Sequence, residues 1–168
     1  MLVFDLETDG FLNEATTIHC LSIYDTETKQ ATVYNDQGSA DPIVRGITYL
    51  DQADLIAGHN IIGFDIPIIQ KFFPWFKNDN VLDTLILSRI FHPNMMELDK
   101  RKKWNHMPLK LYGRHSLESY GYRLGVYKGC YGSTTDWKEW TQDLQDYCEQ
   151  DTNVTYHLCS HFQKYLTS

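Results

Sequence analysis

Four carboxylates in three separated segments are the residues of this chain whose types and spacing best fit a common chemistry. Asp5 and Glu7 stand two residues apart in the N-terminal segment MLVFDLETDG, just ahead of the turn signal Thr8-Asp9-Gly10. Because side chains alternate between the faces of a strand, both carboxylates would point the same way. Two like charges side by side repel each other, and a divalent cation between them would remove that repulsion. An Asp-x-Glu triplet alone is weak evidence, so its position at the end of a strand matters.

The other two carboxylates follow different elements. Asp65 comes after the apolar run LIAGHN (55–60) and a short loop, which places it near a helix N-terminus just beyond a strand end. A plain helix-start acid, favoured by the helix dipole, would occupy the same position. Tyr147 and Asp151 are four residues apart in an amphipathic segment, so the phenol and the carboxylate share one helix face. A surface Asp beside a half-buried Tyr would show the same spacing.

If the three segments meet at one edge of a sheet, the four carboxylates offer the ligands that two Mg²⁺ or Mn²⁺ ions require. Both ions are hard cations that prefer oxygen. Two such ions close together can activate a water molecule and stabilise the leaving oxygen during in-line attack on a phosphodiester. The expected chemistry is therefore metal-dependent hydrolysis of a phosphodiester.

Periodicity and turn signals predict the elements that must position these residues. The predicted strands cover residues 1–7, 18–25, 31–35 and 55–60, the first three as an antiparallel meander. The predicted helices cover residues 41–52, 64–76, 84–92, 114–124 and 136–166. The first of these helices is expected to have Pro42 at its first position, and residues 93–113 are expected to be rich in loops. This order predicts an α/β domain, formed by residues 1–168, with a mixed β-sheet flanked by helices.

Composition bounds the class of protein. A chain of 168 residues with 42% apolar residues fits one globular domain. No apolar stretch approaches the length of a membrane span, and the N-terminus does not resemble a signal peptide. The four cysteines form no CxxC pair and are expected to be reduced thiols in a cytoplasmic protein. A net charge of −7 argues against gripping nucleic acid by bulk electrostatics, but bound divalent cations would change the local sign.

Positive charge is concentrated in one stretch of the chain. Six of the fifteen basic residues fall within fifteen positions: Lys100, Arg101, Lys102, Lys103, Lys110 and Arg114. This stretch is either a solvated loop or a surface that guides a nucleic-acid strand toward the metal site.

Three ordered motifs resemble those of the DEDD (DnaQ-like) superfamily of 3′→5′ exonucleases. The matching segments are DLET (5–8) for DxE, HNIIGFD (59–65) for HNxxxFD and YCEQD (147–151) for YxxxD. The tyrosine marks the DEDDy branch, whereas the DEDDh branch, which includes many RNA-trimming enzymes, would place a His where this chain has Asp146.

Further segments resemble the exonuclease domain of phage family A DNA polymerases. They are VLDTLILSR (81–89), GRHSLESYGYRLG (113–125) and YKG (127–129). A polymerase would continue well beyond residue 168, so the chain is expected to be either a free-standing phage-type exonuclease or an excised domain, and we favour the former.

The resemblance implies a ribonuclease-H-like fold and removal of nucleotides from DNA 3′ ends as 5′-mononucleotides. It implies that Asp5, Glu7 and Asp151 hold the metal that binds the attacking water, and that Asp5 is shared with a second metal, which Asp65 supports. Tyr147 would orient the water, since a phenol with a pKa of about 10 is a poor base at neutral pH. The expected partners are single-stranded DNA and, as a candidate, a separate DNA polymerase. Two alternatives stay open: an exoribonuclease on the same fold, and a non-catalytic binding module or polymerase accessory subunit.

Residues close to the motifs each allow two interpretations. Thr8 and Asn60 are expected to contact the substrate, although Asn60 fits a strand-end turn equally well. Phe11 and Leu12, just past the first motif, either stack on the terminal base or belong to the core. His59 is expected to be structural, because hard cations prefer oxygen ligands.

Three further expectations concern residues outside the motifs. Asp83 is expected to cap the helix that begins at Thr84, or else to support the metal site from behind. His157 and His161 are four residues apart, but without an HExxH pattern they are a weak signal for zinc. The Trp and Tyr residues between 131 and 140 are expected to pack against the last helix.

Overall fold

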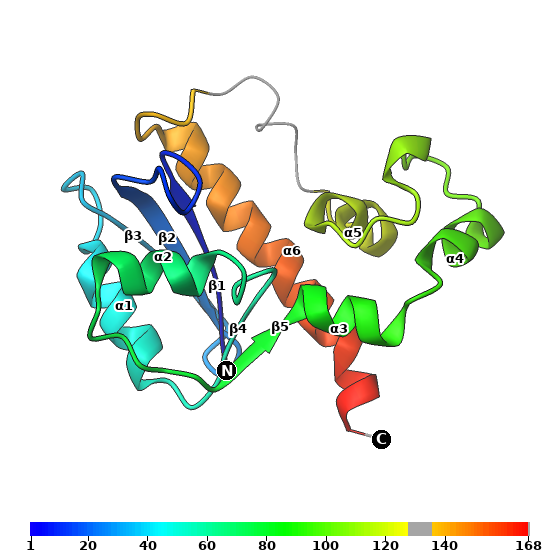
Figure 1. Cartoon of the computed structure of the whole chain (residues 1–168), viewed down its shortest axis with the longest axis horizontal. Helices are drawn as coiled ribbons and strands as arrows, with labels where there is room; N and C mark the ends of the chain where they lie inside the picture. The colour runs from blue at the N-terminus through cyan, green and yellow to red at the C-terminus, as the bar shows by residue number, and fades with distance from the viewer. Residues whose placement is uncertain (128–135, 168) are drawn as a thin grey trace.

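The computed structural model describes residues 1–127 and 136–167 and contains a five-stranded mixed sheet in the order β3-β2-β1-β4-β5 (Figure 1). The strands are β1 (Leu2–Thr8), β2 (Ile18–Asp25), β3 (Gln30–Asn35), β4 (Ile56–Gly58) and β5 (Val81–Asp83). β1, β2 and β3 form the predicted antiparallel meander, while β4 runs parallel to β1 and β5 parallel to β4. The mixed sheet is therefore confirmed, and β5 is a short strand that periodicity did not predict.

The described helices include several that the sequence predicts and one that it does not. They are α1 (Ile43–Gln52), α2 (Asp65–Phe72), α3 (Thr84–Phe91), α4 (Met95–Lys102), α5 (Leu117–Leu124) and α6 (Gln142–Leu166), with a 3₁₀ turn, η1, at Leu109–Leu111. The expectation of a loop-rich stretch at 93–113 is wrong, because α4 and η1 lie within it. The segment MMELDKRK of α4 consists mainly of strong helix formers, but it lacks an apolar period that would have revealed it.

Four predicted helix ends differ from the observed ones by two residues or more, in each case for a local reason. Pro42 is the N-cap of α1 instead of its first helical residue. α2 stops before Pro74, because a residue that precedes proline disfavours the helical conformation. α5 begins after Ser116, whose hydroxyl accepts a hydrogen bond from a backbone N–H of the first turn. α6 begins at Gln142 instead of 136, with Thr141 as a side-chain cap.

Alternation along β1 divides the core between the two faces of the sheet. Even-numbered residues such as Phe4 form an apolar cluster with residues of α1 and α2, including Ile47. On the opposite face, Val3 packs with Cys159 of α6. The two carboxylates of the first motif occupy the next odd-numbered positions of β1, so they also face α6.

A second apolar cluster joins α3, α5 and α6, and it includes Leu87, Leu117 and Phe162. We call α3, α4, η1 and α5 (residues 84–124) the helical lobe. Because α6 contributes both to this cluster and to the packing against Val3 of the sheet, this long helix joins the sheet to the helical lobe (Figure 1). Within the helical lobe, Asp99 of α4 and Arg123 of α5 form a buried ion pair with an O–N distance of 2.7 Å.

Three of the four cysteines lie in the part of the chain that the structure describes. Cys20, Cys148 and Cys159 are buried free thiols, whereas Cys130 lies outside the described residues. In the part of the chain that the structure describes, no helix is both long and apolar enough to cross a membrane.

Candidate active site

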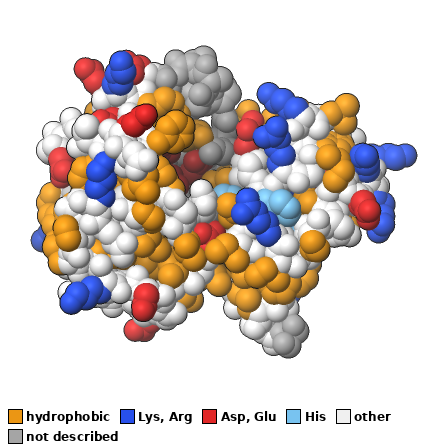
Figure 2. Space-filling view, viewed as in Figure 1, with side chains coloured by type: hydrophobic (Ala, Val, Ile, Leu, Met, Phe, Trp, Pro, Cys, Tyr) orange, Lys and Arg blue, Asp and Glu red, His pale blue; other side chains and the backbone are white. Residues whose placement is uncertain are grey.

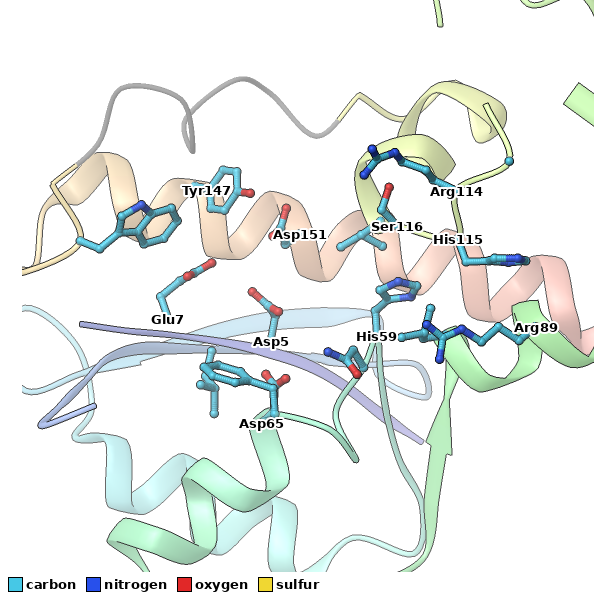
Figure 3. A pocket seen from close by; sticks show the side chains of 17 residues that line it. Asp5, Glu7, His59, Asp65, Arg89, Arg114, His115, Ser116, Tyr147 and Asp151 are labelled. Atoms are coloured by element: carbon cyan, nitrogen blue, oxygen red, sulfur yellow. The ribbon is translucent and has the colours of Figure 1, made fainter. Parts of the chain in front are cut away.

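All five predicted catalytic residues line one cavity of about 630 Å³ between the sheet and the helical lobe. Asp5 and Glu7 come from β1, Asp65 is the first residue of α2, and Tyr147 and Asp151 lie one turn apart on α6. Figure 3 shows these side chains converging on the space between β1 and α6. In the space-filling view, acidic side chains lie in the hollow between the two halves of the molecule (Figure 2).

The position of Asp65 follows from the way β1 and β4 separate. The two strands pair only at Leu2 with Ile56 and at Val3 with Ala57, and β4 ends one residue later. Beyond that point the backbone of Leu6 lies beside the carboxylate of Asp65 and lowers its pKa, against the larger effect of burial. The end of the strand pairing therefore brings the start of α2 into the carboxylate cluster.

The loop before Asp65 is held by Asp83, which ends β5. The carboxylate of Asp83 accepts hydrogen bonds from the backbone N–H groups of Asn60 and Ile62, at 2.9 and 3.0 Å. It also accepts one from Leu85 at 2.9 Å, which confirms its role as the N-cap of α3. Asn60 adopts a left-handed conformation with φ of 61°, so the strand-end turn expected for it is present, and its side chain also lines the cavity.

Asp65 carries the clearest electrostatic sign of a cation site. Burial is the largest cause that raises the pKa of Asp65 to about 8, and the neighbouring charges of Asp83 and Asp151 add to it. Its Oδ1 atom is buried and has no hydrogen-bond partner among the described residues. A buried acceptor left without a partner costs free energy, and a bound divalent cation would remove that cost.

Cys148 lies in the same cluster but does not suit a metal ligand. Its sulfur and carboxylate oxygens of Asp5 and Glu7 lie within 4.8 Å of one another. The thiol donates a hydrogen bond to the backbone carbonyl of Asp5 at 3.3 Å, and burial raises the pKa of Cys148 well above its ordinary value. A neutral thiol beside carboxylates leaves a donor set made of oxygen, which suits Mg²⁺ or Mn²⁺.

A second cavity of about 760 Å³ adjoins the first, and we call it the aromatic cavity. Its lining residues are Glu7, Thr8, Asp9, Gly10, Phe11, Glu14, Asn60, Gly63, Phe64 and Trp137. Phe11 is 80% exposed there, so it is not part of the core, whereas Leu12 packs against the main apolar cluster. The hydroxyl of Thr8 donates to the carbonyl of Gly10 at 2.6 Å and so stabilises the turn after β1.

Sequence reasoning missed the basic wall of the first cavity. Arg89 of α3 and His115, just before α5, lie opposite Glu7 and Tyr147 along the cavity, together with Arg114 (Figure 3). Arg89 and His115 lie in segments that resemble phage polymerases, but that resemblance assigned them no chemical role, so only the packing of the helical lobe places them beside the cavity.

The basic stretch predicted as a strand-binding surface is divided by the structure. Lys100, Arg101 and Lys102 form the last turn of α4, and Lys103 follows as its C-cap. Of the six basic residues in the stretch, Arg114 is the one that lines the first cavity in the described structure.

Histidines and aromatic residues near the site have structural contacts. His59 lines the first cavity, and its Nδ1 lies 2.8 Å from the hydroxyl of Thr84, in agreement with a structural role. His161 pairs with His92, with 3.0 Å between their Nε2 atoms, and His157 is exposed, so the two residues do not form a shared metal site.

The expected packing of aromatic residues against the last helix is present where the structure describes it. The ring of Trp137 lies 6.1 Å from that of Tyr147, and the indole N–H of Trp140 donates to Gln145 at 3.2 Å. Tyr131 lies outside the described residues.

The family follows from a match that covers nearly the whole chain. The sequence signature of the RNase_H superfamily matches residues 2–163. The chain belongs to the RNase H superfamily. The ribonuclease-H-like fold implied by the three motifs is thereby confirmed.

Similarity to named proteins agrees with this family. The chain is 29% identical over 178 residues to the DNA-directed DNA polymerase of Escherichia phage T7, covering 92% of this chain and 25% of the polymerase. The chain thus spans 25% of the length of this relative, and the resemblance to phage polymerases is confirmed.

Two solved structures show the same fold. Brucella melitensis NrnC with bound Mg²⁺ has a TM-score of 0.66 at 18% identity, covering 98% of this chain and 72% of that chain. The zinc-bound E. coli ExoI–ssDNA complex has a TM-score of 0.58 at 15% identity, covering 98% of this chain and 41% of that chain.

Proposed function

We propose that this RNase H superfamily member, a 3′→5′ exonuclease, degrades single-stranded DNA to 5′-mononucleotides with two bound divalent cations, Mg²⁺ or Mn²⁺. One observation carries the proposal: carboxylates from β1, α2 and α6 converge in a single open cavity. A non-catalytic binding module would have no need for clustered acids, whose mutual repulsion destabilises the folded chain until cations bind.

Asp5, Glu7, Asp65 and Asp151 are the proposed metal ligands. Asp5 is the proposed shared ligand, because it lies between Asp65 and Asp151 in the cavity (Figure 3). Cations bound there would lower the pKa of the attacking water and neutralise the charge that develops on the phosphate. The buried and unpartnered Oδ1 of Asp65 supports its place in this set.

Tyr147 is the proposed positioning group for the attacking water. Its hydroxyl points along the cavity toward Asp151 (Figure 3), and its ring is held edge-on against Trp137. A phenol in this place donates or accepts one hydrogen bond and so fixes the direction from which water approaches the phosphorus. We assign it no role as a general base.

The aromatic cavity is the proposed site of the 3′-terminal nucleotide. It adjoins Glu7, and exposed Phe11 offers a ring on which a base of any type can stack, an interaction worth about 1–3 kcal/mol. Thr8 and Asn60 line the same space and supply polar groups for the terminal sugar. Leu12 would support Phe11 from the core.

DNA is the proposed substrate because the related protein from phage T7 is a DNA polymerase and because the ExoI structure is a complex with single-stranded DNA. A separate DNA polymerase is the partner class that the same relative suggests. The carboxylate site itself does not distinguish deoxyribose from ribose, so an exoribonuclease is the competing outcome.

A matched pair of oligonucleotides tests the proposal. Single-stranded DNA and RNA of the same sequence are incubated with Mg²⁺, Mn²⁺ or excess EDTA, and the products are separated by chromatography. We expect 5′-mononucleotides from DNA with either metal, none with EDTA, and none from the Asp5→Asn variant. Faster turnover of RNA would instead identify an exoribonuclease, and products in EDTA would refute the metal site.

A further inference from the structure

We propose that Arg89 and Arg114 bind the phosphates of the first two linkages on the 5′ side of the scissile bond. The inference rests on the proposed exonuclease function and adds the residues that hold the part of the strand that remains after each cleavage.

The two ends of the first cavity differ in chemistry, and this difference gives the strand a direction. Glu7 lies at the end that adjoins the aromatic cavity, whereas Arg89 and Arg114 lie at the other end, with Asp5 and Asp151 between them (Figure 3). A strand whose 3′-terminal base occupies the aromatic cavity and whose scissile phosphate meets the carboxylates must leave past the two arginines.

Both arginines are available to an anion. No ion pair within the described residues includes Arg89 or Arg114. The Nε of Arg114 donates to the backbone carbonyl of Lys110 at 2.8 Å, which fixes the side chain while its terminal nitrogens point into the cavity (Figure 3). A guanidinium held in this way matches two oxygens of a phosphate diester with its planar fork.

The backbone under Arg114 is held by the buried ion pair of the helical lobe. Arg123 donates from Nη2 both to Asp99 and to the carbonyl oxygen of Arg114, each at 2.7 Å. The backbone N–H of Gly113, which precedes Arg114, donates to Asp99 Oδ2 at 2.8 Å. Gly113 has a φ of 75°, a conformation that residues other than glycine rarely adopt. Arg114 therefore projects from a rigid turn instead of a mobile loop.

The positive charge of this wall comes from the arginines and not from His115. Burial, followed by the charges of Arg123 and Arg89, lowers the pKa of His115, so its imidazole is neutral at physiological pH. Its Nδ1 is hydrogen-bonded to the hydroxyl of Ser88, the residue before Arg89. His115 thus links the turn of Arg114 to the helix of Arg89 and holds the two guanidinium groups on one wall of the cavity.

A charge-removal cycle tests the assignment. Single-stranded DNA carries one methylphosphonate, an uncharged replacement for phosphate, at the first or second linkage 5′ of the scissile bond, or at a distant linkage as control. For the wild type, we expect the two near replacements to lower kcat/KM by about tenfold or more, as for the loss of a charge-assisted hydrogen bond, and the distant one to have little effect.

The arginine variants complete the cycle. Arg89→Gln and Arg114→Gln should lower kcat/KM on unmodified DNA by a similar factor, and each should abolish the penalty of one near methylphosphonate. The slope of log KM against log salt concentration should fall by about 0.7 for each lost contact with a single strand. Arg114→Lys, which keeps the charge but not the fork, should fall between the wild type and Arg114→Gln.

The matched control is Arg45→Gln, which removes an exposed arginine of α1 that lines neither cavity. Melting temperatures of all variants identify any loss of fold. If wild-type enzyme shortens DNA normally but every variant shows the wild-type methylphosphonate penalty, the arginine assignment is wrong and the exonuclease function stands. If unmodified DNA undergoes no metal-dependent shortening from its 3′ end, both proposals fall.

Discussion

Asp5 occupies the centre of the carboxylate cluster, and its loss should affect activity more than folding. Asp5→Asn keeps the shape of the side chain but removes its charge, so we expect activity to fall by at least about a thousandfold, or about 4 kcal/mol of barrier. The metal-free melting temperature should stay the same or rise, because clustered acids repel one another. Asp79→Asn, an exposed carboxylate outside both cavities, is the matched control. Near wild-type turnover of Asp5→Asn would show that the site is misplaced.

The hydroxyl of Tyr147 can be separated from its ring. Tyr147→Phe preserves the packing against Trp137 but removes the group proposed to orient water. We expect single-turnover hydrolysis to slow by about 10²-fold, while stabilisation of the protein by Mg²⁺ is retained. Tyr49→Phe, which removes a hydroxyl bonded to Asp25 away from the site, should leave the rate unchanged. Equal single-turnover rates for Tyr147→Phe and wild type would leave the hydroxyl without a role.

At the scale of elements, the buried pair of Asp99 and Arg123 joins α4 to α5. The two side chains are 1% and 6% exposed. Asp99→Ala leaves a buried guanidinium without its partner, so we expect the free energy of unfolding to fall by about 3–5 kcal/mol. Asp41→Ala breaks a pair with Arg45 that is more than half exposed, and it should cost less than about 1 kcal/mol. Urea unfolding measures both, and equal losses would contradict the account of the helical lobe.

Elements defined by local patterns could be predicted from the sequence, whereas elements that depend on contacts between distant positions could not. β1 and β2 were predicted within a residue of their bounds, because alternating or continuous apolar runs between turn signals identify strands. Asp5, Glu7 and Asp65 were found because they lie near predicted strand ends, and Asp151 because it shares a helix face with Tyr147. α4 was missed because its burial depends on Asp99 meeting Arg123, a contact across 24 positions of sequence that no local pattern encodes. Arg89 was missed for a similar reason, since the helical lobe must fold before it faces the carboxylates.

For the whole molecule, the raised pKa of Asp65 links stability to pH and to metal. The folded chain holds a proton up to about pH 8 that the unfolded chain releases near its ordinary 3.8. The contribution of Asp65 to stability is therefore present below the lower value and is lost as the pH rises through this window. In EDTA, the melting temperature of Asp65→Asn relative to wild type should rise steadily from pH 5 to pH 8. A difference that does not change with pH would contradict the buried, metal-free carboxylate.

Mg²⁺ should offset this loss of stability in the wild type as the pH rises. Because a metal ligand must be deprotonated, the stabilisation by Mg²⁺ should grow as the pH rises toward 8. The same titration on Asp65→Asn should show a smaller and flatter response. Equal responses of the two proteins would remove Asp65 from the ligand set.

A metal-dependent 3′→5′ exonuclease can be recognised by the polarity and the metal dependence of its digestion of DNA. One single-stranded DNA is prepared with a label at its 3′ end and another with a label at its 5′ end, and each is digested with Mg²⁺ or with excess EDTA. We expect the 3′ label to be released at once as a mononucleotide and the 5′-labelled strand to shorten one nucleotide at a time. EDTA should stop both. Release of the 5′ label first, or digestion that continues in EDTA, would contradict this function.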